Sequence, residues 1–315
     1  MQNPTIAVLM TCYNRKQKTL DSLDSLFSQD GGEDRSLSVY LVDDGSTDGT
    51  TTAVAAAYPQ VNILQGDGSL FWNRGMHMAF AAALVGVASQ NENRDYDYYL
   101  WLNDDTILYP AALAGLLHAS DAVAAKGNPQ AIIVGATCDP QTGVLTYGGL
   151  ESQDRYRPLR FSLVAPGSEP QRCDTLNGNC VLIPKSVAGI VGNLDPAFTH
   201  YLGDLDYGLR TQKQGGSVWL APGFCGTCSQ NLRPRTWTET TENLPWYLQW
   251  QRVGQPKGLN LTQMTLPPVT EWKIFAQRYA GLLWPVYWLF PYLRLLLLPV
   301  VRIGSNLRSS QLKLD

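Results

Sequence analysis

The chain has 315 residues and a formal net charge of −3, with 24 Lys and Arg residues against 27 Asp and Glu residues. This length allows one large domain, or one domain with an appended segment, and the balance of apolar and charged residues is typical of a globular protein. The sequence shows no stripe of Lys and Arg that would match a phosphate backbone, so we expect no nucleic-acid partner.

The first ten residues, MQNPTIAVLM, contain neither a basic stretch nor an apolar run long enough for a signal peptide. We therefore expect a cytoplasmic chain whose six cysteines are reduced and mostly buried. Cys225 and Cys228 form a lone CxxC motif without a second pair at zinc-finger spacing, which favours a structural role over a metal or redox role.

Short apolar runs alternate with helical patterns in the first two hundred residues. The runs are typical of strands covered on both faces, and they lie at residues 5–10, 37–42, 61–65, 98–102 and 131–136. Helices are predicted between them, at residues 15–28, 47–58, 74–89 and 110–124. This order predicts an α/β fold with a mostly parallel, Rossmann-like sheet flanked by helices, and a ligand crevice at the carboxyl ends of the strands.

Polar segments follow the first four predicted strands. They are TCYNR (11–15), DDGSTDGT (43–50), GDGSLFWNRG (66–75) and NDDT (103–106). Because the carboxyl ends of parallel strands lie at one edge of a sheet, we expect these four segments to form one site.

The pair Asp43 and Asp44 begins the second segment. A capped turn between strand and helix accounts for Ser46, Thr47 and Asp48 but not for the doubled acid. A carboxylate at this position could accept hydrogen bonds from a nucleobase N–H or from ribose hydroxyls.

Asp104 and Asp105 follow a strand that is otherwise apolar, where two like charges repel each other and lose solvation. A hard cation such as Mg²⁺ or Mn²⁺ would neutralise them and bridge the phosphates of a nucleotide, with one carboxylate on the metal and the other near ribose or the metal's water. No GxGxxG or GxxxxGK[ST] motif follows the first strand, which argues against a nicotinamide enzyme and a P-loop NTPase.

Six segments, taken together and in order, resemble the inverting family 2 glycosyltransferases of the GT-A fold, which use nucleotide-sugar donors. They are TCYNR, VDDGSTDGT, GDGSLFWNRGMHMAF, WLNDDT, LNGNCVLIPK and FTHYLGDLDYGLR, over roughly residues 5–230. The segment GDGSLFWNRGM is similar to the rhamnosyltransferase-like branch. The resemblance implies sugar transfer from a UDP- or dTDP-linked donor, such as a deoxyhexose like rhamnose, to a glycan or lipid-linked hydroxyl in polysaccharide biosynthesis, with divalent Mg²⁺ or Mn²⁺.

The resemblance also implies a role for each matching residue. Thr11, Tyr13 and Arg15 would contact the base and the diphosphate, and Asp44, with Asp43 second, would contact the pyrimidine. Asp105 would bind the metal and Asp104 would lie near ribose. Trp72 and Gly75 would border the donor, Gly178 and Asn179 would line the sugar pocket, and Asp204 would be the general base.

Inverting transfer needs one carboxylate that deprotonates the acceptor hydroxyl. Asp204 and Asp206 are both candidates, and in a helix beginning near Gly203 only one of them can face a pocket. The family often has Glu-Asp where this chain has Gly203 and Asp204, which favours Asp204. The remaining alternative is that both acids only stabilise the helix, by a favourable interaction with the positive end of its dipole.

The sequence departs from the family's pattern at one ligand position of the expected metal site. Many relatives place a His after the last core strand, whereas the comparable stretch here, APGFCGTCSQN, has Cys228 and Ser229. We therefore expect Asp105 and diphosphate oxygens alone to hold the metal. His200 lies four residues before Asp204 and is a candidate for the acceptor side of the site.

A change in composition near residue 233 predicts a catalytic domain at 1–232 and a C-terminal helical, apolar segment at 233–315. Residues 279–304 are long enough to span a bilayer, but three prolines and Arg294 interrupt them. This pattern favours peripheral docking at the inner face of the membrane. The alternative is packing on the catalytic domain or in a homo-oligomer.

Two other functions fit the sequence less well than sugar transfer does. A sugar-nucleotide-forming nucleotidyltransferase would be expected to begin with a GxGxR loop, which TCYNRK lacks. A non-catalytic membrane-associated scaffold of the same fold is disfavoured because Asp44, Asp104, Asp105 and Asp204 are all present.

Overall fold

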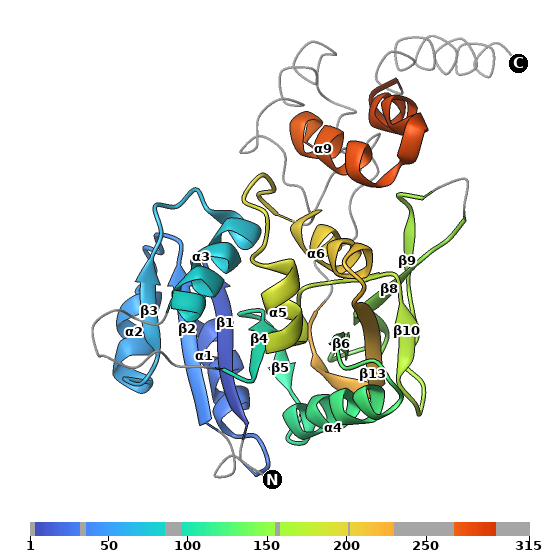
Figure 1. Cartoon of the computed structure of the whole chain (residues 1–315). Coiled ribbons are helices and arrows are strands. Elements are labelled where there is room, and N and C mark those ends of the chain that lie inside the picture. The colour runs from blue at the N-terminus through green and yellow to red at the C-terminus, as the bar shows by residue number, and fades with distance from the viewer. Residues whose placement is uncertain are drawn as a thin grey trace, which may run out of the picture. The chain divides into compact units, whose positions relative to one another are not determined.

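The structure is a computed structural model that describes residues 4–31, 36–85, 96–154, 158–200, 202–229 and 268–293. The chain divides into two compact units (Figure 1). The first comprises residues 1–153 and 161–230, and the second comprises residues 154–160 and 231–315.

The first unit contains a ten-stranded sheet with the order β10-β13-β6-β12-β4-β1-β2-β3, to which β5 and β7 are added beside β13 and β6. The strands are β1 (Thr5–Cys12), β2 (Ser36–Asp43), β3 (Asn62–Gln65), β4 (Tyr98–Leu102), β5 (Ile107–Leu108), β6 (Ala131–Cys138), β7 (Leu145–Tyr147), β10 (Gln171–Cys173), β12 (Cys180–Pro184) and β13 (Ser217–Thr227). A smaller sheet contains β8 (Gly149–Ser152), β9 (Phe161–Leu163) and β11 (Thr175–Leu176).

The mostly parallel α/β sheet predicted from the sequence is confirmed. Strands β1, β2, β3 and β4 pair in parallel, as do β6 and β13. The sequence did not predict β12, which lies antiparallel between β4 and β6. Strand β12 joins the two parallel groups into one sheet.

Helices cover both faces of this sheet. They are α1 (Lys16–Phe27), α2 (Thr50–Ala57), α3 (Phe71–Val85), α4 (Ala112–Ala125), α5 (Lys185–Val191) and α6 (Leu202–Lys213). Ala7 and Leu9 of β1 belong to the same apolar cluster as α3, α5 and α6 residues, whereas Val8 belongs to the cluster that includes α1, α2 and α4 residues. The two-sided cover explains why the core strands are continuously apolar.

The predicted helices all form, with bounds that differ by a few residues. Helix α3 begins at Phe71 rather than at residue 74, and residues 86–89 of that prediction lie outside the described residues.

Strand pairing brings the predicted polar segments to one edge of the sheet. Cys12 at the end of β1 pairs with Asp43 at the end of β2, and Asp43 pairs with Gln65 at the end of β3. Strand β4 runs parallel to β1 on its other side. The predicted convergence is therefore confirmed.

Residues 268–293 of the second unit are mostly helical. Helix α9 (Val269–Tyr279) is followed by the 3-10 helix η2 (Gly281–Leu283) and by helical residues 284–293. The indole of Trp272 donates to the Tyr287 carbonyl at 3.1 Å and that of Trp288 to the Val269 carbonyl at 3.2 Å, so the two helices pack together. No helix in the described ranges is long and apolar enough to cross a membrane. The predictions for residues 233–267 and 294–315 lie outside the described residues.

Candidate functional site

The acidic loop after β4 is paired with a basic residue from the loop after β1. Nη1 of Arg15 lies 3.1 Å from Oδ1 of Asp104 and 2.9 Å from Oδ2 of Asp105, and Nζ of Lys18 lies 4.0 Å from that Oδ2. The repulsion expected between the two acids is thus offset by positive charge from this chain itself.

Burial raises the pKa of Asp104 to about 7, although the charge of Arg15 acts in the opposite direction. The carboxyl of Asp104 is therefore poised near neutrality, where a change in nearby charge alters its protonation.

The two acids after β2 face inward and hold neighbouring loops. Asp43 accepts a hydrogen bond from the Ser46 amide at 2.8 Å and one from the Thr51 hydroxyl. Asp44 accepts backbone N–H groups of Gly68, Leu70 and Phe71 at 2.9 to 3.2 Å.

Both oxygens of Asp44 thus have donors from the loop that leads into α3. This loop is tightly constrained, because Phe71 adopts a positive φ of 55°, which a side chain with a Cβ seldom adopts. Base recognition by Asp44, which the sequence predicted, stays a prediction, and the structure gives this acid a role in loop organisation.

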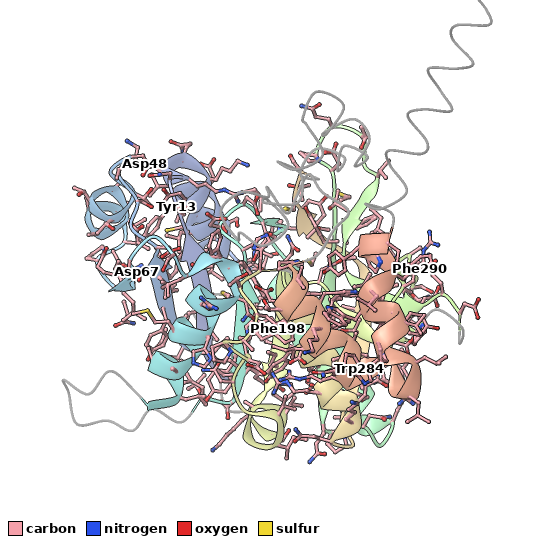
Figure 2. The ribbon with its side chains drawn as sticks, turned by 90° about the horizontal axis from the view of Figure 1, so that it is seen from above. Tyr13, Asp48, Asp67, Phe198, Trp284 and Phe290 are labelled. Carbon is pink, nitrogen blue, oxygen red and sulfur yellow. The ribbon has the colours of Figure 1, made fainter. Side chains whose placement is uncertain are left out.

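The loop after β1 is fixed to the loop after β2. The Asn14 amide donates to Oγ of Ser46 at 2.9 Å, and Oδ1 of Asn14 accepts from the Thr47 amide at 2.7 Å. Tyr13 remains 53% exposed and lies with Asp48 at this edge of the first unit (Figure 2). Its ring is available to a ligand in a way that the buried acids are not.

Thr11 and Gly75 are in close contact. A Cβ on residue 75 would lie 2.3 Å from Oγ1 of Thr11, so only glycine lets α3 approach the end of β1 this closely. The two predicted donor-side residues therefore form one packed junction.

Trp72 lies between the acidic loop and the segment before β12. Its Nε1 donates to Oδ1 of Asn103 at 2.7 Å, and its ring would lie 2.3 Å from a Cβ on residue 178. Gly178 is required here because the indole occupies the space of a side chain. The same Cβ would lie 3.4 Å from Cβ of Asp204, so Trp72, Gly178 and Asp204 are neighbours.

Asp204 is a buried carboxylate at the start of α6. Its Oδ2 accepts the Gly178 amide at 3.0 Å and its Oδ1 the Leu205 amide at 2.8 Å. Burial raises its pKa to about 7, and the backbone donors only partly oppose this effect. A carboxylate with such a pKa can accept a proton near neutral pH.

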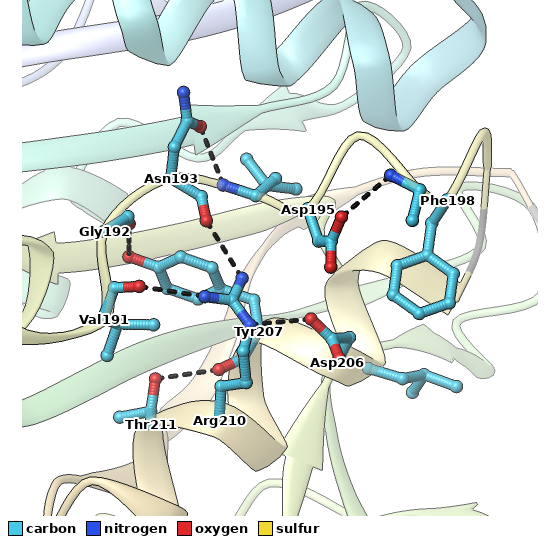
Figure 3. A network of polar contacts seen from close by, with 12 residues as sticks. Val191, Gly192, Asn193, Asp195, Phe198, Asp206, Tyr207, Arg210 and Thr211 are labelled. Carbon is cyan, nitrogen blue, oxygen red and sulfur yellow. Dashed lines mark hydrogen bonds and ion pairs between the residues drawn. The ribbon is translucent and has the colours of Figure 1, made fainter. Parts of the chain in front are cut away.

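Asp206 has a different environment (Figure 3). Its Oδ2 lies 2.7 Å from Nε of Arg210, and the guanidinium also donates to the carbonyls of Val191 and Asn193 at 2.9 and 3.0 Å. These three hydrogen bonds tie α6 to the end of α5, so the pair of Asp206 and Arg210 serves the packing of the helix.

His77 and His200 differ in their contacts. Nδ1 of His77 lies 2.6 Å from the Leu194 carbonyl. Nδ1 of His200 is buried without a hydrogen-bond partner in the part of the chain that the structure describes. Burial lowers the pKa of His200, and the positive charge of Arg15 lowers it further, so His200 is neutral near pH 7.

All six cysteines are free and buried, as predicted. The two residues of the CxxC motif have separate surroundings: Cys225 packs in the apolar core, whereas the Cys228 thiol donates to Oδ1 of Asp105 at 3.5 Å. Nδ2 of Asn179 donates to Sγ of Cys228 at 3.6 Å. Burial raises the pKa of Cys228 to about 12.

Contacts therefore run without a break from Asp204 to the acidic loop, through Gly178, Asn179, Cys228 and Asp105. The sequence did not single out Asn103 and Lys18, which join the same cluster, or a contact between Cys228 and Asp105. Asn103 lies directly before the acidic pair, which was an available signal, whereas no local pattern links residues 105 and 228.

Comparison with known proteins is consistent with this geometry. Residues 7–141 match the sequence profile of the family described as Glycosyl transferase family 2. The chain is 28% identical over 239 residues to N-acetylglucosaminyl-diphospho-decaprenol L-rhamnosyltransferase from two strains of Mycobacterium tuberculosis, which covers 69% of this chain and 72% of the relative.

Two solved structures share the fold at low sequence identity. S. aureus TarS has a TM-score of 0.50 and 12% identity, with coverage of 87% of this chain and 70% of TarS. GalNAc-T7, solved with UDP, GalNAc and Mn²⁺, has a TM-score of 0.54 and 11% identity, with coverage of 72% of this chain and 44% of GalNAc-T7.

Proposed function

Because this chain is a family 2 glycosyltransferase of the GT-A fold, we propose that it transfers a sugar, with inversion, from a nucleotide-diphosphate sugar to a lipid-linked or glycan hydroxyl. A UDP- or dTDP-linked deoxyhexose such as rhamnose is the donor we favour, since the relatives are rhamnosyltransferases. Their name gives a diphospho-decaprenol acceptor, which supports a lipid-linked acceptor here.

The observation that carries this proposal is the position of Asp204. It is a buried carboxylate with a pKa of about 7, linked by contacts to the acidic loop where the nucleotide would bind. In the proposed reaction Asp204 takes the proton of the acceptor hydroxyl, whose oxygen bonds to the anomeric carbon as the diphosphate leaves from the opposite side. We omit Asp206 from this role because Arg210 already pairs with it.

The donor would lie against Trp72 and the Gly178 backbone, with Tyr13 exposed toward the base. We propose that Arg15 meets the diphosphate, and its position beside the acidic loop with a side chain that is 39% exposed supports this role. His200, neutral and with a free Nδ1 among the described residues, is the proposed acceptor-side group.

The acidic loop fits a divalent cation such as Mg²⁺ or Mn²⁺. Asp105 offers a carboxylate, and the loop already accommodates the positive charges of Arg15 and Lys18. Within the described ranges, no group of three or more His, Cys, Asp and Glu side chains surrounds a common metal position. Diphosphate oxygens and water would complete the shell, and the bound cation would stabilise negative charge on the leaving diphosphate.

The second unit carries an apolar face that suits docking on a membrane surface. Leu282 is 98% exposed, and Leu283, Val286, Leu289, Phe290 and Leu293 are 45 to 60% exposed. They recur at residues 282 and 283, 286, 289 and 290, and 293, which places them along one side of η2 and of the helical residues after it, which carry Trp284 and Phe290 in Figure 2. A lipid-linked acceptor would be reached from such a surface, so we propose peripheral association with the inner face of the membrane.

The function is tested by incubating the full chain with UDP-, dTDP- and GDP-linked sugars and an undecaprenyl- or decaprenyl-diphosphate sugar as acceptor. We expect release of a nucleoside diphosphate and a product of inverted anomeric configuration. Binding of sugar nucleotides without transfer to any hydroxyl acceptor, or formation of a sugar nucleotide from a nucleoside triphosphate, would overturn the proposal.

Membrane docking is tested by flotation with anionic liposomes. We expect the triple variant Leu282→Asp, Val286→Asp and Phe290→Asp to lose flotation, while Val144→Asp, at an apolar position of the first unit that is 63% exposed, floats like the original chain. Continued flotation of the triple variant, or its change from oligomer to monomer without loss of flotation, would contradict membrane docking.

A further inference from the structure

The two oxygens of Asp105 have different partners. Oδ2 accepts from Arg15 at 2.9 Å and lies 4.0 Å from Lys18. Oδ1 accepts from the thiol of Cys228, whose Sγ lies 3.5 Å away. The basic residues therefore occupy one side of this carboxylate, and a sulfur atom occupies the other.

The distance between this oxygen and this sulfur suits two ligands of one cation. Bonds of about 2.1 Å to a carboxylate oxygen and about 2.3 Å to a thiolate place the two donor atoms about 3.1 to 3.6 Å apart, for angles between square and tetrahedral. The observed separation of 3.5 Å lies in this range.

The sulfur is also held in place. Nδ2 of buried Asn179 donates to Sγ of Cys228 at 3.6 Å, and the Cys228 amide donates to the Cys138 carbonyl at 3.0 Å. Asn179 belongs to the segment that carries Gly178, the backbone partner of Asp204. A ligand fixed from outside the metal shell in this way gains affinity for its metal.

We propose that Sγ of Cys228 is a second protein ligand of the divalent cation at Asp105, and that it makes the site favour Co²⁺, Zn²⁺ and, less strongly, Mn²⁺ over Mg²⁺. The inference rests on the proposed function for the presence of that cation. On binding, the S–H bond breaks, the sulfur keeps the electron pair and bonds to the cation, and the proton passes to solvent, so no oxidant or reductant is needed. Thiolate is a soft ligand, and Mg²⁺ binds oxygen instead.

The test is titration of the full chain with Co²⁺ in the presence of UDP and a non-thiol reductant. A thiolate ligand produces a sulfur-to-cobalt charge-transfer band in the near ultraviolet, which oxygen ligands do not give. We expect this band, together with release of one proton per Co²⁺ bound from the thiol. Cys228→Ser should abolish the band and weaken Co²⁺ binding at least tenfold, while Mg²⁺ binding changes less than twofold.

Matched variants separate coordination from folding. Cys173→Ser alters a buried thiol in β10, outside the contact series, and should keep the band. Cys228→His should restore Co²⁺ affinity without the charge-transfer band, because imidazole is a ligand that lacks sulfur. Asp105→Asn should weaken Co²⁺ and Mg²⁺ binding alike.

The possible results are distinct. Co²⁺ binding without the band, or with equal affinity in Cys228→Ser, would overturn the thiolate ligand and leave the proposed transferase in place. Failure of the original chain to bind any divalent cation with UDP would overturn the inference and the metal at Asp105 together, while transfer measured in EDTA would still support the rest of the proposed function.

Discussion

The acidic loop after β4 and the start of α6 both bury a carboxylate whose pKa burial raises to about 7, but they balance its charge differently. Asp104 lies beside the Arg15 guanidinium, with Asp105 and Lys18 in the same cluster. Asp204 accepts the backbone N–H groups of Gly178 and Leu205, and a hydrogen bond with the neutral side chain of Asn177 also stabilises its charged form.

The difference indicates what each region can do. Carboxylates that already pair with a basic side chain can exchange it for a metal, or for a metal bound to phosphate, with little change in net charge. The carboxylate stabilised by neutral dipoles has no cation to exchange, and it can take the proton of a bound hydroxyl instead. The first region therefore suits the charged donor, and the second suits the acceptor hydroxyl.

The largest expected effect comes from removing the proton acceptor. Asp204→Asn should lower the rate of sugar transfer by about 10²- to 10⁴-fold, the usual contribution of a general base, and leave the affinity for UDP within twofold. Initial rates of nucleoside diphosphate release and calorimetric titration with UDP measure the two quantities. Full activity in this variant would show that Asp204 is not the proton acceptor, and the proposed difference between the two regions would be wrong.

Asp206→Asn is the matched change on the same helix, and it should act on stability instead. It leaves the guanidinium of Arg210 without its buried carboxylate, which costs about 3 kcal/mol. Urea unfolding measures the loss. At a temperature where the variant is still folded, the rate of transfer should remain within a few-fold of the original rate. A loss of rate as large as that of Asp204→Asn would indicate that Asp206 takes part in the reaction.

The rate of transfer should depend on pH. Only the deprotonated form of Asp204 can accept a proton, and its pKa is raised to about 7, so kcat should fall by about tenfold per pH unit below that value. Asp104 titrates in the same window, and Asp104→Asn should keep an acid limb of the same slope if Asp204 alone is the base. A profile of kcat that stays flat between pH 5 and 8 would contradict the assignment.

The smallest expected effects separate the two basic residues of the acidic loop. Arg15→Gln should lower the free energy of unfolding at pH 8 by about 1 kcal/mol, a value kept low because the side chain is 39% exposed and water screens the pair. Lys18→Gln, at 4.0 Å and 56% exposed, should change it by less than about 0.5 kcal/mol. Equal losses in denaturant unfolding would show that the loop does not depend on Arg15 in particular.

Part of the candidate site was predictable because it depends on local pattern. Apolar runs with turn residues after them predicted β1, β2, β3 and β4, and the parallel order then placed their acidic ends at one edge. The helix supposed near Gly203 also forms, since α6 begins at Leu202 and carries Asp204 in its first turn.

Other features depended on packing that no local pattern contains. The resemblance favoured Asp204 over Asp206 as the proposed base, and the structure adds a difference in partners: Gly178 donates to Asp204 from a distant segment, whereas Asp206 pairs with Arg210 on its own helix. The requirement for glycine at residue 203 is another such feature, because a Cβ there would lie 1.7 Å from Oδ1 of Asn73.

The sequence by itself determined the parallel α/β sheet, the edge at which its loops meet and the acids that those loops carry, because side-chain periodicity and turn chemistry act within a few residues. Only the tertiary structure decided that Arg15 neutralises the acidic loop, that Asp44 holds a neighbouring loop and that Cys228 contacts Asp105. These contacts join residues 24 to 123 positions apart, and their formation depends on strand pairing and on the space that neighbouring side chains leave.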